Sequence, residues 1–244
     1  MTPQRLDRIA SVSWLPYLLL VVAAFALVPK PMPAVGGNVQ DVTAYFGTNA
    51  AAIKVFVCLA SVADLFLLVF AVYLANKLRA SETKSNLLSW LALASGGALV
   101  AFEFASAMTM LTLAITAAAS VAGTGVLGIL FNNFELANIF LFGLFFAAVG
   151  VGSLVGGSFP RWFAWVTCST GLIEVVTGCL LTFGVKQAGS ISFVSVLIWI
   201  IVAGVVAARL EWTNSAPAST HLGLSGNRRS HEINWRTSLS ECWR

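Results

Sequence analysis

The sequence has few charged residues. Of its 244 residues, 10% are Asp, Glu, Lys or Arg, and 58% are hydrophobic. A soluble domain carries roughly 25% charged and roughly 45–50% apolar residues. Because one soluble core of this length cannot bury so much apolar surface, we expect lipid to surround the chain. The net charge of +4 lies in short loops and tails, which favours an anionic leaflet over nucleic acid as its partner.

Groups that hold metals and cofactors are also scarce. The two histidines, His221 and His231, lie in the polar C-terminal segment. The four cysteines form neither a CxxC spacing nor a cluster with histidine: Cys58, Cys168, Cys179 and Cys242. This pattern predicts no metal, no disulfide framework and no cofactor. The chain also lacks GxxxxGK[ST], HExxH, GxSxG and an Asp-rich prenyl-diphosphate motif, which excludes nucleotide-driven pumps and the familiar membrane hydrolases and prenyltransferases.

Apolar stretches of about 20 residues are present instead, the length that crosses a hydrocarbon core. We predict an all-α, polytopic transmembrane bundle of about six spans in residues 1–211 and a basic, disordered tail in residues 212–244. Arg5 and Arg8 precede the first apolar stretch, but its length exceeds a signal-peptide core, so we expect it to be retained. The expected spans are 12–29, 52–76, 87–112, 136–157, 161–184 and 191–210.

The stretch after residue 87 is too long for one simple span. One possibility is a tilted helix that protrudes from the membrane, and another is that residues 113–134 dip into the membrane. A third is that these residues form a seventh span, which would place the tail on the other side of the membrane. Asn132, Asn133 and Asn138 are expected to cap the start of the fourth span.

Basic and aromatic residues both favour a cell-membrane protein with its two termini in the cytoplasm. One side holds most of the basic residues: Arg5, Arg8, Lys77, Arg79, Lys84, Arg161, Arg209 and the tail residues Arg228, Arg229, Arg236 and Arg244. The other side holds Lys30, Lys54 and Lys186. An aromatic belt is expected on the first side: Trp14, Tyr17, Tyr73, Trp90, Trp162, Trp165 and Trp212.

Carboxyl groups inside apolar segments are costly and are the first candidates for function. Asp64 and Glu174 lie near the middle of the second and fifth spans, and Glu103 lies towards the outer leaflet in the third. Lys54 and Glu135 flank the level of Glu103. Each acid is either a functional group or a neutral hydrogen-bonding group between helices, contributing ~0.6 kcal/mol.

Two stripes of small or polar residues share a helix face. The fifth span carries Thr167, Thr170, Glu174 and Thr177, with Gly171 and Gly178 on the same face. This polar face must contact other helices or water rather than lipid, and it is a candidate substrate path. The fourth span carries Ala148, Gly152 and Gly156, which predicts close helix packing within the bundle or in a homo-oligomer. The neighbouring phenylalanines are expected to face lipid: Phe140, Phe142, Phe145 and Phe146.

Three short motifs carry a resemblance. Residues 42–46 read Val-Thr-Ala-Tyr-Phe, Lys77-Leu78-Arg79 follows the second span, and Phe159-Pro160-Arg161-Trp162-Phe163-Ala164-Trp165 opens the fifth. Together they resemble a group of small six-helix integral membrane proteins of bacteria, common in actinobacteria, over about residues 10–210. Ala164 replaces the glycine usual in that group, which has no assigned activity. The resemblance therefore implies an architecture only.

Three hypotheses of function stay open. The first is a small-solute transporter in which Asp64 or Glu174 exchanges protons. The second is an intramembrane acid/base enzyme, of cyclase or isomerase type, that acts on a lipophilic small molecule with Asp64 and Glu174 as a pair and Glu103 as a further candidate acid. The third is an accessory protein that binds a membrane-protein partner through the Gly152 face or the basic tail.

Overall fold

A computed structural model describes residues 3–28, 39–82, 86–117, 121–185 and 188–213. The described residues form helices and short turns, which confirms the predicted all-α fold. The residues of the tail after Thr213 lie outside the described part, as do Lys30, Lys84 and Lys186. The helices are α1 (Pro3–Ser11), α2 (Trp14–Leu27), α3 (Val39–Thr48), α4 (Ala50–Ser81), α5 (Leu87–Thr116), α6 (Val121–Gly156), α7 (Arg161–Thr182) and α8 (Ala188–Thr213).

Within the described residues, six helical segments are long and apolar enough to cross a membrane. The first combines α1 and α2 in Arg5–Leu27, and the others are α4, α5, the Gly125–Gly156 part of α6, α7 and α8. At most half of each apolar window is buried by the rest of the protein, and many large side chains such as Leu19 and Leu172 point outward. This exposure fits contact with lipid rather than water.

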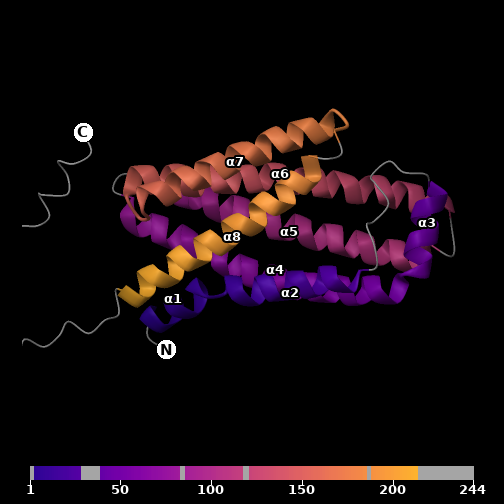
Figure 1. The fold of residues 1–244 in the computed structure, drawn as a ribbon, viewed down its shortest axis with the longest axis horizontal. Helices are drawn as coiled ribbons and strands as arrows, with labels where there is room; N and C mark the ends of the chain where they lie inside the picture. Colours follow the sequence, from indigo (N-terminus) through magenta and orange to yellow (C-terminus); the bar gives the residue numbers. More distant parts are fainter. Residues whose placement is uncertain (1–2, 29–38, 83–85, 118–120, 186–187, 214–244) are drawn as a thin grey trace, which may run out of the picture. The chain divides into compact units, whose positions relative to one another are not determined.

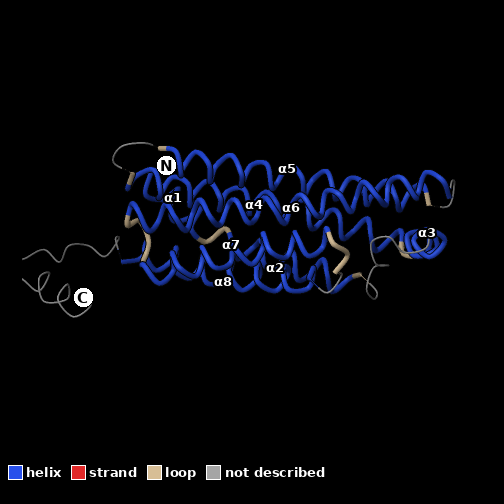
Figure 2. The backbone as a smooth tube through the Cα atoms, turned by 90° about the horizontal axis from the view of Figure 1, so that it is seen from above, coloured by secondary structure: helices blue, strands red, loops and turns tan. Residues whose placement is uncertain are grey.

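The spanning helices run antiparallel to their neighbours in the chain (Figure 1). In the bundle α5 packs between α4 and α6, α6 packs between α5 and α7, and α8 crosses obliquely against α7, α2 and α1. Figure 1 shows α3 lying across one end of the bundle, which we call the α3 end, and Figure 2 shows the same helix end-on. The other end, which we call the basic end, holds six of the described basic residues: Arg5, Arg8, Lys77, Arg79, Arg161 and Arg209.

Short connections set this up-and-down order. Glu82, just after α4, accepts hydrogen bonds from the backbone N–H (3.0 Å) and the hydroxyl (3.1 Å) of Ser89 in the first turn of α5. Gly157 and Gly184 have positive φ angles of 68° and 87° directly after α6 and near the end of α7. Glycine adopts this conformation without steric cost and so ends a helix within one residue.

The long segment after residue 87 is helical over nearly all of its described residues. α5 continues to Thr116 and α6 begins at Val121, so the described part of residues 113–134 contains neither a seventh span nor a dipping loop. The expected capping role of Asn132, Asn133 and Asn138 is wrong, because all three lie inside α6.

Aromatic side chains are more deeply packed than the sequence suggested. Three phenylalanines of the α6 run are buried: Phe142, Phe145 and Phe146. The ring centroids of Phe146 and Trp199 are 4.3 Å apart. The expectation that the run faces lipid is therefore wrong for these three residues. Tyr17, Tyr73 and Trp14 are also buried rather than lying in a belt. The tryptophans of the basic end that remain exposed are Trp90, Trp162, Trp165 and Trp212. Lipid and protein interiors are equally apolar, so hydropathy alone does not separate the two environments.

Candidate functional site

One tight layer fixes how α4, α5 and α6 are aligned. A Cβ atom added to Gly96 of α5 would lie 2.9 Å from the Ala71 Cβ of α4 and 3.2 Å from the Phe145 ring of α6. These three residues therefore meet at one level of the bundle. Only glycine leaves room for this approach of the two neighbouring helices.

Seven residues from this layer towards the α3 end, each helix presents a polar side chain. Position 64 of α4 is Asp64, position 103 of α5 is Glu103 and position 138 of α6 is Asn138. Seven residues are close to two helical turns, about 10 Å, so these side chains repeat the faces of Ala71, Gly96 and Phe145. The helix register therefore brings Asp64, Glu103 and Asn138 to one level.

Electrostatic contacts show that this layer is a cluster. Glu103 interacts with both Asp64 and Glu135, and Asp64 also interacts with Glu135. Tyr17 of α2 interacts with Glu103 and Asp64. Groups from four helices are thus within electrostatic range of one another at this level, and we call Tyr17, Asp64, Glu103 and Glu135, with Asn138 at the same level of α6, the carboxyl cluster.

Glu135 lies one turn further towards the α3 end. Its Oε1 accepts a hydrogen bond of 2.5 Å from the Ser106 hydroxyl of α5. Ser61 of α4 occupies the matching level, and its hydroxyl oxygen is buried with no hydrogen-bond partner among the described residues. The polar region therefore extends over two adjoining turns rather than one.

The carboxyl cluster has no counter-charge. Among the described residues, the ion pairs join Lys77 to Asp7 and Glu211, and none reaches Asp64, Glu103 or Glu135. Lys54, which the sequence analysis placed near the level of Glu103, is exposed near the start of α4. Asp64 lies 10 residues from Lys54 and 13 from Lys77, or about 15 Å and about 20 Å along the helix, which places the cluster well inside the span.

Asn138 is the least satisfied side chain of the cluster. It is 2% exposed, and both its amide nitrogen and its amide oxygen lack a hydrogen-bond partner among the described residues. A buried polar group without a partner is costly and needs an explanation.

Glu174 belongs to a different contact. It is fully buried on α7, and its carboxyl group accepts hydrogen bonds from the Ser192 and Ser195 hydroxyls of α8. Its neighbours in the stripe are buried as predicted: Thr167, Thr170, Gly171, Thr177 and Gly178. At this level α7 packs directly against α6 and α8. A Cβ atom added to Gly171 would lie 3.0 Å from the Gly143 carbonyl oxygen of α6, and Trp199 of α8 donates a 2.9 Å hydrogen bond to Thr167.

The small-residue stripe of α6 also faces inward. Ala148 is buried, and Cβ atoms added to Gly152 and Gly156 would meet Leu78 and Ser81 of α4 at 3.0 Å and 2.6 Å. These three residues therefore pack within one copy of the chain. A second set of glycines that the sequence analysis did not single out, Gly143 and Gly150, faces α7.

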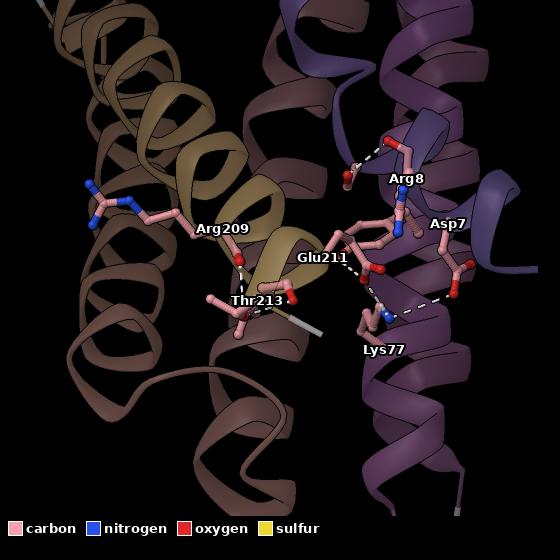
Figure 3. Close-up of polar contacts among 9 residues, drawn as sticks. Asp7, Arg8, Lys77, Arg209, Glu211 and Thr213 are labelled. Atoms are coloured by element: carbon pink, nitrogen blue, oxygen red, sulfur yellow. Dashed lines mark hydrogen bonds and ion pairs between the residues drawn. The ribbon is translucent and has the colours of Figure 1, made fainter. Parts of the chain in front are cut away.

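A separate set of charges ties three helices together at the basic end (Figure 3). Lys77 of α4 lies 2.6 Å from Glu211 of α8 and 3.6 Å from Asp7 of α1. The Tyr73 hydroxyl donates a 3.0 Å hydrogen bond to the same Glu211 oxygen. We call Asp7, Tyr73, Lys77 and Glu211 the basic-end clasp, and it fixes the start and the end of the spanning region to α4.

The sequence identified part of this site. Asp64 and Glu103 were singled out, but Glu135 was placed at a flank, Tyr17 in a belt and Asn138 at a cap. The missing signal was the alignment of the helices, which follows from pairing Gly96 with Ala71 and Phe145.

The arrangement suits reversible binding of positive charge. Three carboxyl groups in one low-dielectric region cannot all be ionised without a proton or another cation among them. Within the described residues, no three His, Cys, Asp or Glu side chains gather closely enough to hold a metal ion. No family model, curated protein or solved structure matches the chain.

Proposed function

We propose that this protein is a small multi-pass carrier of the bacterial cell membrane, in which proton binding at the carboxyl cluster is coupled to the movement of a small solute. The observation that carries the proposal is that Asp64, Glu103 and Glu135, from three helices, lie within electrostatic range of one another without a basic partner among the described residues. Protons are the simplest species that neutralise such a group, and their uptake and release change the charge inside the span.

The proposal includes both termini in the cytoplasm. Six described basic residues lie at the basic end, whereas Lys54 is the described one towards the α3 end. Positively charged flanks favour the cytoplasmic side. The resemblance to six-helix bacterial membrane proteins agrees with this arrangement.

Two observations support the carrier over the competing hypotheses. An acid/base enzyme would pair Asp64 with Glu174, whereas Asp64 interacts with Glu135 and Glu103, and Glu174 accepts hydrogen bonds from two serines of α8. A partner binding through the fourth-span glycines would need a surface that α4 already covers at Gly152 and Gly156.

The test measures charge movement after a pH jump. Purified protein is reconstituted into vesicles adsorbed on a solid-supported membrane, and the external solution is switched to a lower pH. A proton that enters a site inside the span crosses part of the membrane, so the wild type should give a transient current. Combined Asp64→Asn, Glu103→Gln and Glu135→Gln substitution should remove the current, while Glu174→Gln, a matched buried acid outside the cluster, should keep it.

Two results would overturn the proposal. One is an unchanged transient in the triple variant, with circular dichroism and gel filtration showing that it is folded. The other is a sustained proton current without added solute, which would indicate a channel. If the triple variant does not fold, Glu103→Gln alone should reduce the transient relative to Glu174→Gln, and equal transients in these two would count against the cluster.

A further inference from the structure

We infer that the outer face of α1 binds the anionic lipids of the leaflet at the basic end. This outer face consists of Arg5, Leu6, Arg8 and Ile9, which are all exposed, and the two apolar side chains, Leu6 and Ile9, are 53% and 54% exposed. The inference goes beyond the proposed carrier function and does not depend on proton coupling.

A break in the helix sets α1 at an angle to α2 (Figure 1). At the break the backbone N–H of Val12 donates a 3.3 Å hydrogen bond to the Ile9 carbonyl, three residues back. The N–H of Ser13 donates a bond of the same length to the Ala10 carbonyl, and the Ser13 hydroxyl donates a second one of 2.8 Å. Bonds over three residues tighten the chain into a turn, and the hydroxyl replaces part of the lost helical pairing. α1 therefore has a direction of its own and is not a straight extension of the span.

The length of α2 places α1 at the membrane boundary. α2 has 14 residues, which rise about 21 Å, less than the roughly 30 Å of a hydrocarbon layer. The end of α1 next to α2 therefore lies at the edge of the hydrocarbon. The charged residues Arg5, Asp7 and Arg8 favour the headgroup zone for the rest of the helix.

The outer face of α1 divides into two flanks. At about 100° per residue, Arg5 and Arg8 lie on one side of this face, and Leu6 and Ile9 lie on the other. A helix with this division lies along a membrane surface, with its apolar flank towards the acyl chains and its basic flank towards the headgroups. The acyl chains then remove Leu6 and Ile9 from water, which is favourable.

The opposite side of α1 is already covered by protein. α1 packs against α4 and α8, and Asp7 lies 3.6 Å from Lys77 in the basic-end clasp (Figure 3). Neither Arg5 nor Arg8 forms an ion pair with another described residue. Two exposed guanidinium groups next to an apolar flank are complementary to an anionic phospholipid, because its phosphate accepts charge-assisted hydrogen bonds from arginine and its acyl chains cover the apolar flank.

The experiment measures which lipid lies next to α1 in the full-length protein. A fluorophore is attached at Leu6→Cys, after the native cysteines have been replaced by alanine: Cys58, Cys168, Cys179 and Cys242. The protein is reconstituted into bilayers that contain either spin-labelled phosphatidylglycerol or spin-labelled phosphatidylcholine, which quench the fluorophore on contact. Phosphatidylglycerol should be preferred at least about fivefold, the effect of one arginine near an anionic surface.

Two double variants separate α1 from the general charge of the basic end. Arg5→Gln with Arg8→Gln should abolish the preference for phosphatidylglycerol. Arg161→Gln with Arg209→Gln removes the same charge from exposed arginines of the same end and should keep the preference.

Three results would overturn the inference. The first is equal quenching by the two lipids, and the second is an equal loss of preference in the two double variants. The third is quenching by neither lipid, which would mean that water or a protein partner covers the outer face. If the Arg5/Arg8 double variant does not fold, the labelled parent is measured in about 1 M NaCl, where charges are screened beyond about 3 Å. The preference should then fall, and an unchanged preference would also overturn the inference.

Discussion

Replacing Gly96 by alanine should move the helices that assemble the carboxyl cluster. The new Cβ atom would lie 2.9 Å from the Ala71 Cβ and 3.2 Å and 3.4 Å from two carbons of the Phe145 ring. Carbon atoms in ordinary contact are about 3.5–4.0 Å apart. α4 and α5 must therefore separate by roughly half an ångström, and overpacking of this kind costs about 1–3 kcal/mol.

The next residue of the same helix is the matched control. Gly97 has no atom within 4 Å of an added Cβ, so Gly97→Ala should be neutral or stabilise the helix by up to about 1 kcal/mol. Moving the methyl group from α4 to α5, in the double variant Ala71→Gly with Gly96→Ala, should restore much of the loss, since the contact then holds one methyl group as before.

The assay is reversible unfolding in mixed micelles, followed by circular dichroism as denaturing detergent is added. Gly96→Ala should unfold at a lower fraction of denaturing detergent than Gly97→Ala, and the double variant should lie between them. Equal stabilities for Gly96→Ala and Gly97→Ala would refute the packing of this layer and the alignment of the helices derived from it.

Two further predictions concern contacts outside the cluster. Lys77→Met removes the 2.6 Å ion pair to Glu211, which is 9% exposed, and should destabilise the bundle by about 1–3 kcal/mol, a range reduced because Lys77 is 27% exposed. Lys54→Met replaces an exposed lysine and should change the same unfolding curve little; equal effects of the two substitutions would show that the basic-end clasp contributes nothing. Trp199→Phe removes the hydrogen bond to Thr167 and should lower the free energy of unfolding by about 0.5–1.5 kcal/mol through that bond. The contribution is measured as the coupling energy of a double-mutant cycle with Thr167→Val, and a coupling energy near zero would contradict the contact.

The distribution of buried and exposed faces shows how far sequence patterns reach. The threonine and glycine stripe of α7 was predicted to avoid lipid, and it is buried, because residues three and four apart share a face whatever the rest of the fold does. The phenylalanine run of α6 was assigned to lipid and is mostly buried. Phenylalanine is equally stable against lipid tails and against other helices, so its hydropathy carries no information about its neighbour.

The sequence by itself determined that the chain forms six apolar helices of spanning length and which end of the bundle is basic. It also placed most helix ends within a few residues, although α6 begins at Val121 rather than at residue 136. These properties depend on the length and composition of single segments, because a segment's transfer into lipid is decided locally. Only the tertiary structure decided that Asp64 and Glu103 meet Glu135, Tyr17 and Asn138, while Glu174 pairs with two serines of α8. That outcome depends on the alignment of helices far apart in the chain, which is set by the fit of a few small residues such as Gly96 against Ala71 and Phe145.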